Sequence, residues 1–306
     1  MRRLLCLLAV LLPLAAAGAA EVFVAPNGSD DNPGSLTRPF ATLQHARDVV
    51  RELRAAGKLP AGDTTIFLRG GTYSLAAPLE LTAADSGTEQ SRLIFRPWRG
   101  EQVWLSGGRT IAPSQFRPVT DPATTKRLDP AARGKVLVLD LQAAGIPADV
   151  DVLPDVYRGF SGKHPVLMEL FCGGERMQPA RWPNEGFAHY GEIVDPGYGL
   201  RDRSNPQAIA RFTYEGDRPQ RWRVEDGVWL QGYWARAYMC ETVRVGKIDP
   251  IKKQIDFAAP NTYGLDTWGA KRFFAINVLE ELDRPGEWFL DRKQRLLLFW
   301  PPADLK

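Results

Sequence analysis

Residues 64–108 decide the fold, and they read TTIFLRGGTYSLAAPLELTAADSGTEQSRLIFRPWRGEQVWLSGG. Short apolar pieces recur along this stretch, at TTIFL (64–68), LEL (79–81), RLIF (92–95) and QVWL (102–105). Glycine-rich corners separate them, and no helical pattern lies between them. The step from Ile66 to Leu93 is 27 residues, and the step from Leu79 to Val103 is 24. Strands that recur at two interleaved phases are typical of stacked solenoid coils, so the spacing predicts a parallel β-helix.

The residues before this stretch predict a leader and a cap. The chain opens MRRLLCLLAVLLPLAAAGAA, a basic start followed by a short apolar run and small residues, which predicts a signal peptide over 1–20. After a short strand and a polar loop, apolar residues repeat at helical spacing over 43–53. Because the first coil of a solenoid needs a cover, we expect this helix to cap the β-helix. Residues 21–110 are therefore predicted to hold the cap helix and the first coils.

The rhythm of short strands stops at the end of that segment. A proline-rich polar connector follows, and then two stretches, 166–183 and 241–260, that read as hairpins. Antiparallel hairpins of uneven length do not belong to parallel coils. We therefore expect an inserted antiparallel, sandwich-like β module over 111–275. Apolar strands resume over 276–306, which predicts a return to the β-helix in an all-β fold.

Composition narrows the classes of partner and cofactor. With residues 1–20 removed, basic and acidic residues number 37 and 36, so charge gives no reason to expect a nucleic-acid or membrane partner. The three histidines are not at metal-ligand spacing, so no metal site is predicted. Cys172 and Cys240 are the cysteines that remain. A secreted chain permits a disulfide between them but does not require one.

Five carboxylates crowd the stretch LEELDRPGEWFLDR at 279–292. A pair of carboxylates is the usual machinery of glycoside hydrolysis, and Asp283 and Glu287 are the two that a turn would bring face to face. Pro285 and Gly286 predict that turn, with proline in its second position and glycine in its third. In the alternative interpretation, which we favour, the carboxylates are structural: they cap turns and pair with neighbouring arginines.

Side chains suited to sugar rings come from two further stretches. The ARWPNEGF stretch contributes Arg181, Trp182 and Asn184, which combine a charge, an aromatic face and an amide. Trp234 and Tyr238 follow a glycine break and are expected to be exposed. These five residues form the predicted substrate-binding set. The alternatives are a conformational role for ARWPNEGF and core packing for most of the nine tryptophans.

Six blocks of the sequence, taken in order, resemble secreted right-handed parallel β-helix proteins, with the pectate-lyase-like fold, of the glycoside hydrolase family 141 type. The blocks are VAPNGSDDNPGSLTRPFATLQHA, FLRGGTY, SGTEQSRLIFRPWRGE, ARWPNEGF, RWRVEDGVWLQGYW and LEELDRPGEWFLDR. The resemblance implies a β-sandwich-like module that interrupts the first coils of a long β-helix, and action on complex polysaccharides such as pectin or xylan. It also implies catalytic aspartates on later coils, beyond Lys306, so no catalytic residue is carried over to a matching position.

Together these inferences predict a secreted or periplasmic polysaccharide-processing protein, with this chain as the N-terminal portion of a glycoside hydrolase of plant or algal cell-wall glycans. One alternative is a non-catalytic glycan-binding or surface module. Another is a polysaccharide lyase on the same fold, the one case in which Ca²⁺ is expected as a cofactor. The final residues are apolar and do not resemble a segment that would cover the end of a β-helix. We therefore also expect self-association through an open β-helix end.

Overall fold

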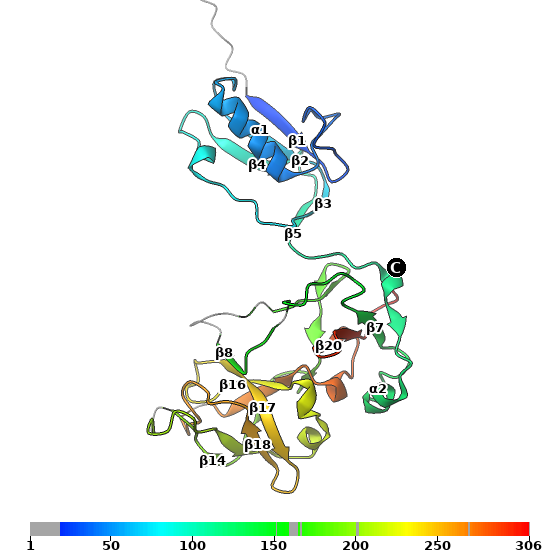
Figure 1. The fold of residues 1–306 in the computed structure, drawn as a ribbon, viewed down its shortest axis with the longest axis vertical. Helices are drawn as coiled ribbons and strands as arrows, with labels where there is room; N and C mark the ends of the chain where they lie inside the picture. The colour runs from blue at the N-terminus through cyan, green and yellow to red at the C-terminus, as the bar shows by residue number, and fades with distance from the viewer. Residues whose placement is uncertain are drawn as a thin grey trace, which may run out of the picture. The chain divides into compact units, whose positions relative to one another are not determined.

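A computed structural model describes residues 19–150, 152–158, 165, 167–199, 202–268 and 270–305. They form two compact units, with unit 1 ending at Thr110 and unit 2 beginning at Ile111 (Figure 1). Strands dominate both units and helices are few, so the all-β prediction is confirmed. The signal peptide predicted over 1–20 lies outside the described residues, except for its last two positions.

Unit 1 consists of two small parallel sheets and one long helix. One sheet has the order β1-β2-β4, and the other pairs β3 with β5. The elements are β1 Ala20–Val24, α1 Leu43–Ala55, β2 Thr64–Leu68, β3 Gly71–Ser74, η1 Ala83–Asp85, β4 Leu93–Pro97 and β5 Val103–Ser106. Val22 pairs with Ile66 and Ile66 pairs with Phe95, so successive passes of the chain stack in parallel. The spacing predicts this stacking, while a complete β-helix stays a prediction.

Helix α1 covers one face of the three-stranded sheet (Figure 1). Its buried residues Leu43, Ala46 and Val50 pack with Val22 and Ile66 of the sheet. The helix predicted from the apolar repeat is therefore present. Its apolar stripe closes the core of unit 1, as expected of a helix with one buried face.

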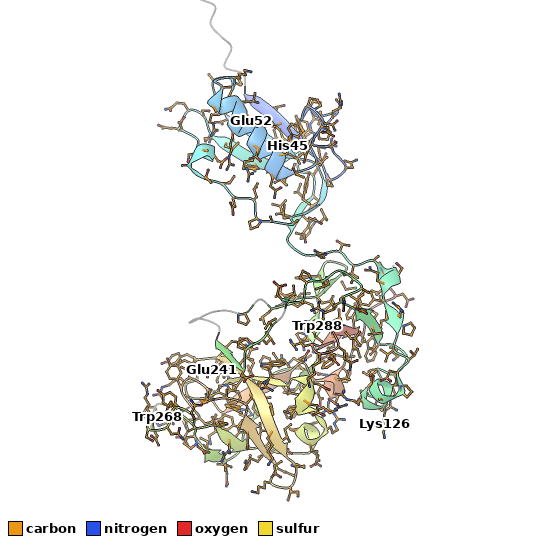
Figure 2. The ribbon with its side chains drawn as sticks, viewed as in Figure 1. His45, Glu52, Lys126, Glu241, Trp268 and Trp288 are labelled. Atoms are coloured by element: carbon orange, nitrogen blue, oxygen red, sulfur yellow. The ribbon has the colours of Figure 1, made fainter. Side chains whose placement is uncertain are left out.

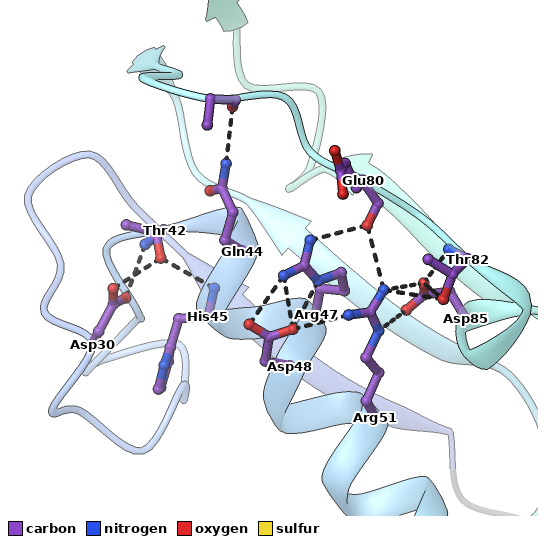
Figure 3. Close-up of polar contacts among 11 residues, drawn as sticks. Asp30, Thr42, Gln44, His45, Arg47, Asp48, Arg51, Glu80, Thr82 and Asp85 are labelled. Carbon is purple, nitrogen blue, oxygen red and sulfur yellow. Dashed lines mark hydrogen bonds and ion pairs between the residues drawn. The ribbon is translucent and has the colours of Figure 1, made fainter.

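Polar contacts fix α1 at its start and along its side (Figure 3). The Thr42 hydroxyl accepts from the His45 amide at 3.1 Å, which caps the helix, and the Asp30 carboxylate accepts from the Thr42 amide at 2.9 Å. Farther along the helix, the Arg51 guanidinium donates to Asp85 at 2.7 Å. This arginine lowers the pKa of Asp85 to about 2. The η1 turn is thereby held against the helix.

One strand of unit 1 was predicted wrongly, and another was missed. The LEL stretch is irregular, because the Glu80 carbonyl accepts from the Arg47 guanidinium at 2.9 Å instead of from a neighbouring strand. The glycine-rich corner after β2 forms β3 because Tyr73 is buried there. The Tyr73 hydroxyl lies 2.8 Å from the carbonyl oxygens of both Val24 and Arg69. Val24 is 49 residues from Tyr73 and Arg47 is 33 residues from Glu80, so the local sequence pattern gave no sign of these contacts.

Unit 2 holds a five-stranded sheet, a nine-stranded sheet and a two-stranded hairpin. The five-stranded order is β11-β20-β21-β7-β6, antiparallel except where β11 lies beside β20. The nine-stranded path is β12-β19-β16-β17-β18-β15-β14, with β13 on β19 and β8 on β17, and it is antiparallel throughout. The strands are β6 Arg117–Pro118, β7 Leu137–Asp140, β8 Val156–Arg158, β9 Phe171–Cys172, β10 Glu175–Arg176, β11 Gln178–Pro179, β12 Arg181–Trp182, β13 Ala188–His189, β14 Ile193–Asp195, β15 Arg211–Thr213, β16 Trp229–Tyr233, β17 Glu241–Asp249, β18 Gln254–Phe257, β19 Arg272–Ile276, β20 Glu287–Asp291 and β21 Leu296–Phe299. The helical pieces are η2 Pro113–Gln115, α2 Pro122–Arg127, η3 Arg218–Arg221, η4 Val224–Asp226 and η5 Leu279–Glu281.

Both predicted hairpin turns are present in unit 2, but the first hairpin is much shorter than 166–183, because β11 and β12 pair with β20 and β19 instead. The β9–β10 hairpin turns at Gly173 and Gly174, whose φ angles are 61° and 85°. The β17–β18 hairpin turns just after Asp249. Antiparallel pairing beyond residue 110 is therefore confirmed. Cys172 and Cys240 are both free.

The segment expected to return to the coils, 276–306, lies within unit 2. Its strands β20 and β21 form a hairpin at the centre of the five-stranded sheet, between β11 and β7. Trp288 is buried on one face of that sheet and Phe289 on the other. A strand buried on both faces reads as a continuous apolar run, so sequence alone did not distinguish it from a strand of a solenoid. Figure 2 shows Trp288 within the unit, whereas Trp268 is 73% exposed.

The nine-stranded sheet packs one face onto an aromatic core with Trp234 at its centre. The Trp234 ring contacts the rings of Phe212, Phe257 and Phe273, with centroid distances of 5.9, 5.0 and 6.0 Å. Its indole N–H donates to the carbonyl of Glu241 at 2.9 Å. This ring is 1% exposed, so the prediction of an exposed Trp234 is wrong.

The glycine that suggested exposure has a different role. A Cβ atom on Gly232 would lie 2.5 Å from the Trp234 ring, so the glycine makes room for the indole and does not interrupt the strand. Tyr238 is 76% exposed, so its predicted exposure is confirmed. Only one of these two aromatic residues is therefore available to a ligand.

Replacing Trp234 and Tyr238 in turn tests which of the two aromatic residues belongs to the core. We expect Trp234→Ala to lower the free energy of unfolding by about 3–5 kcal/mol, because it leaves a large cavity. The control Tyr238→Ala should change it by less than about 0.5 kcal/mol. Urea unfolding of the full chain measures both values. Equal effects of the two substitutions would contradict this assignment of the core.

Candidate functional site

The two stretches that carry most of the predicted site residues contact each other. The Asn184 side-chain amide donates to the Asp283 carboxylate at 2.7 Å. The Arg284 guanidinium donates to the Asn184 carbonyl at 2.9 Å and lies 3.5 Å from the Glu185 carboxylate. Because these residues are about a hundred positions apart, the contacts join ARWPNEGF to the turn in LEELDRPGEW. We call this contact region the junction.

A fully buried carboxylate lies next to the junction. Glu281 has no exposed side-chain surface, and it accepts hydrogen bonds from Arg218, from Arg221 at 3.1 Å and from the Trp222 indole at 2.8 Å. Arg218 also reaches the Asp283 carboxylate at 3.1 Å. Charge-assisted bonds of this kind are among the strongest in proteins. Glu281 and Arg218 therefore anchor the turn on which Asp283 sits.

Glu287 has a different environment. Its carboxylate accepts from the backbone amides of Asp283 at 3.0 Å and Arg284 at 3.3 Å, across the turn at Pro285 and Gly286. One carboxylate oxygen has no hydrogen-bond donor, although the Arg284 guanidinium lies 3.6 Å away. The residue is 1% exposed. Burial raises the pKa of the Glu287 carboxyl to about 7.

The turn itself forms as predicted. Gly286 has a φ of 89°, and the Glu287 amide donates to the Arg284 carbonyl at 3.4 Å, which closes a turn with Pro285 in its second position. The backbone therefore brings Asp283 and Glu287 to the same side of one tight turn.

The ARWPNEGF stretch is braced from within. The Arg181 guanidinium donates to the carbonyls of Pro183 at 2.8 Å and Gly186 at 2.7 Å. It also stacks on the Phe274 ring at 3.9 Å. Desolvation and the nearby Arg284 charge lower the pKa of Arg181. Arg181 therefore holds the ARWPNEGF turn in its conformation. The same turn also carries side chains suited to sugar binding.

The structure brings together five of the seven predicted site residues and leaves two apart. Arg181, Trp182, Asn184, Asp283 and Glu287 gather around the junction, whereas Trp234 lies in the core and Tyr238 lies on the loop before β17. The Trp182 ring is half-buried and packs edge-on against Trp222 at 5.7 Å.

Three residues that organise the junction were missed by the sequence reasoning: Arg218, Trp222 and Glu281. Trp222 is one of nine tryptophans with nothing local to distinguish it, and Arg218 stands in a proline-containing turn without a recognisable pattern. Neither residue has a local signature, because the carboxylate they share lies about 60 residues away. The crowding of acids around Glu281 was the available signal, since buried acids need cationic partners.

The geometry gives Asp283 and Glu287 structural partners. Asp283 is held by Asn184 and Arg218, and Glu287 is closed off from solvent. A role as a catalytic pair stays a prediction, and the contacts agree with the structural interpretation of this stretch. Among the described residues, no three side chains of the metal-binding types lie together. Within the same residues, the helices are too short or too polar to span a bilayer.

The chain resembles parts of known proteins in sequence and in fold. It is 32% identical over 124 residues to pectate lyase PEL9 of Emericella nidulans, a match that covers 40% of this chain and 26% of that protein. It is 37% identical over 95 residues to the uncharacterized protein YwoF of Bacillus subtilis, covering 31% of this chain and 17% of that protein. No protein-family profile matches the chain.

In the solved structures, the chain is similar to a glycoside hydrolase with a TM-score of 0.64 and 21% sequence identity. This likeness covers 92% of the chain and 43% of the hydrolase, and it shows a shared fold. The chain thus spans less than half of that hydrolase and about a quarter or less of the two curated relatives.

Removing the buried Glu281 carboxylate should destabilise unit 2 strongly. We expect Glu281→Ala to lower the free energy of unfolding by about 3–5 kcal/mol, because two arginines and an indole lose their shared acceptor. Glu225→Ala is the matched control, since Glu225 pairs with Arg223 at the surface and should cost about 1 kcal/mol or less. Chemical denaturation of both variants measures the difference, and a similar small loss for each would count against the anchor.

The raised pKa of Glu287 predicts a specific pH dependence. The folded-state pKa of about 7 lies above the ordinary value of 4.5, so the folded protein binds the extra proton. The stabilisation is complete below the ordinary value and is lost as the pH rises through about 7. We expect the stability difference between native protein and Glu287→Gln to change over this window by up to roughly 3 kcal/mol. Unfolding curves at several pH values measure it, and parallel profiles for the two proteins would refute it.

Proposed function

We propose that this chain is the N-terminal portion of a secreted, pectate-lyase-like protein of the glycoside hydrolase family 141 type that processes plant or algal polysaccharides. The observation that carries the proposal is the junction, where ARWPNEGF and LEELDRPGEW meet through Asn184 and Asp283. These are the two most specific blocks of the family resemblance. The partial sequence similarity to a pectate lyase and the fold shared with a glycoside hydrolase support it.

Within this proposal, the junction positions groups for a glycan and does not cleave it. Asp283 and Glu287 hold the turn, and the turn holds the half-buried Arg181, Trp182 and Asn184 at their places. Trp182 packs toward the aromatic core while Arg181 faces the other side of the sheet, so the groups offered to sugar hydroxyls are the charge of Arg181 and the amide of Asn184. Cleavage would use a pair of carboxylates on the β-helix face, outside the junction, as acid and as nucleophile or base.

A polysaccharide lyase on the same fold is the second candidate, because one relative with sequence similarity is named a pectate lyase. A lyase would need Ca²⁺ and an arginine or lysine base, and it would release an unsaturated product. A hydrolase releases new reducing ends without that product. A non-catalytic module would retain the glycan and release nothing.

Glycan binding and product formation test the proposal together. The purified chain is run through native gels that contain pectin, polygalacturonate, xylan or a neutral glucan, and is then incubated with each glycan. We expect retention by at least one cell-wall glycan, and we expect Asn184→Ala to weaken it about fivefold, since one buried hydrogen bond at the junction is lost. The exposed amide variant Gln207→Ala is the control and should bind as the native chain does.

The products decide between the candidates. New reducing ends without ultraviolet absorbance support a hydrolase, and absorbance that a chelator abolishes supports a lyase. Retention without any product fits a binding module, and it equally fits the proposed portion of a hydrolase whose cleaving carboxylates lie outside this chain, so the longer protein is tested in the same way to separate these two. Absence of both retention and product with every glycan would overturn the proposal.

A further inference from the structure

The outer face of the nine-stranded sheet, opposite the aromatic core, carries a row of polar and aromatic side chains. Tyr233 of β16 pairs with Arg272 of β19, and Arg272 pairs with His189 of β13. Cross-strand partners point to the same side of a sheet, so these three residues lie in one row. The neighbouring residue Phe273 points to the core and is 1% exposed, which places the row on the opposite face.

Two guanidinium groups and three rings contact one another in a row on this face. The Arg272 guanidinium lies 4.4 Å from the centre of the Tyr233 ring and 4.8 Å from that of Phe187. The Phe187 ring lies 5.7 Å from Phe274, which in turn carries the Arg181 guanidinium at 3.9 Å. Stacking on rings orients an arginine without neutralising its charge. We call these five residues the arginine–aromatic face.

Neither arginine of this face forms an ion pair with an acidic side chain among the described residues, although the Glu287 charge acts on Arg181. Arg181 donates only to backbone carbonyls, and the Nε atom of Arg272 is buried without a hydrogen-bond acceptor. By contrast, Arg244 on β17 points to the same side of the sheet and pairs with Asp155 at 2.6 Å. The Nε atom of Arg272 is closed to solvent, so a ligand would meet only the terminal nitrogens of this guanidinium. No acidic side chain of the described residues forms an ion pair with them, which leaves them available to an external anion.

We propose that the arginine–aromatic face binds an acidic sugar of the polysaccharide, with the sugar carboxylate on Arg272 and the sugar ring against Phe187. The guanidinium fork matches a carboxylate, and Phe187 is 37% exposed, which leaves part of its ring free for a sugar face. Arg181, on the far side of Phe274, takes the carboxylate of another acidic residue of the same glycan. This inference rests on the proposed function, because it takes the ligand to be a polysaccharide.

Comparing an acidic glycan with its methyl ester tests the contribution of the sugar carboxylate to binding. The full chain is titrated with polygalacturonate and with its fully methyl-esterified form, and affinity is measured by gel retardation and calorimetry at low and high salt. We expect the native chain to prefer the acid form by about tenfold or more, because charge-assisted hydrogen bonds are lost in the ester. The preference should shrink as salt screens the charges.

Matched variants assign the preference to this face. Arg272→Gln should abolish most of the preference for the acid form and leave affinity for the ester nearly unchanged. Arg181→Gln should lower the preference in part and also weaken binding of both forms, because Arg181 braces the ARWPNEGF turn. Arg244→Gln on the same side of the sheet is the control and should keep the full preference. The melting temperature of each variant confirms that it folds.

The outcomes separate this inference from the proposed function. Equal binding of acid and ester forms, or a preference that survives in Arg272→Gln, overturns the inference while the polysaccharide function stands. An equal loss in Arg244→Gln reassigns the effect to general surface charge and also overturns it. If the chain retains no glycan at all, both this inference and the proposed function are wrong.

Discussion

The buried carboxylate of Glu281 is the constraint on which much of unit 2 depends. It lies between two hydrophobic clusters, since Leu279 and Leu282 on either side belong to one and Trp222 belongs to the other. A charge with no exposure is tolerated only where donors surround it, and here two arginines and an indole do so. The position of the Trp222 ring is thereby fixed.

The Trp222 ring in turn supports the ARWPNEGF turn, which lies nearer the surface. Trp222 packs on Trp182, whose neighbours in the ARWPNEGF turn are tied to Asp283 and Arg284. The same Arg218 that binds Glu281 also binds Asp283. The polar groups at the junction therefore share one network, in which a change at the buried acid reaches the turn through both a ring and a guanidinium. A rigid scaffold of this kind is what a ligand-contacting turn requires.

Features with local causes were predictable from the sequence, and features with distant causes were not. The turn at Pro285 and Gly286 follows from two residues, and the helix from Leu43 follows from its apolar period. The hairpins at Gly173-Gly174 and after Asp249 are similarly local. By contrast, the burial of Trp234 depends on rings from three other strands, and the partners of Glu281 come from η3 and the residue that follows it.

The candidate site was predicted only in part for the same reason: some of its contacts join residues that are far apart in the sequence. Residues that were chosen for their chemistry, such as Asn184 and Asp283, proved to be neighbours because the chain brings two distant turns together. The arginines that organise them have no pattern of their own. Which face of a strand a residue occupies also follows from register, so the row formed by Tyr233, Arg272 and His189 was visible only in the paired strands.

The central position of β20 and β21 has a consequence for how the protein is made. Leu298 of β21 pairs with Val138 of β7, so the middle of the five-stranded sheet forms only after some 160 residues beyond β7 have been synthesised. In unit 1 the strands pair with partners at much shorter range, as from Ile66 to Phe95. Local pairings close faster than distant ones. Unit 1 is therefore expected to fold before unit 2, while the apolar side chains of β7 stay uncovered until β21 is available, and exposed apolar surface of this kind makes a partly folded chain prone to aggregation.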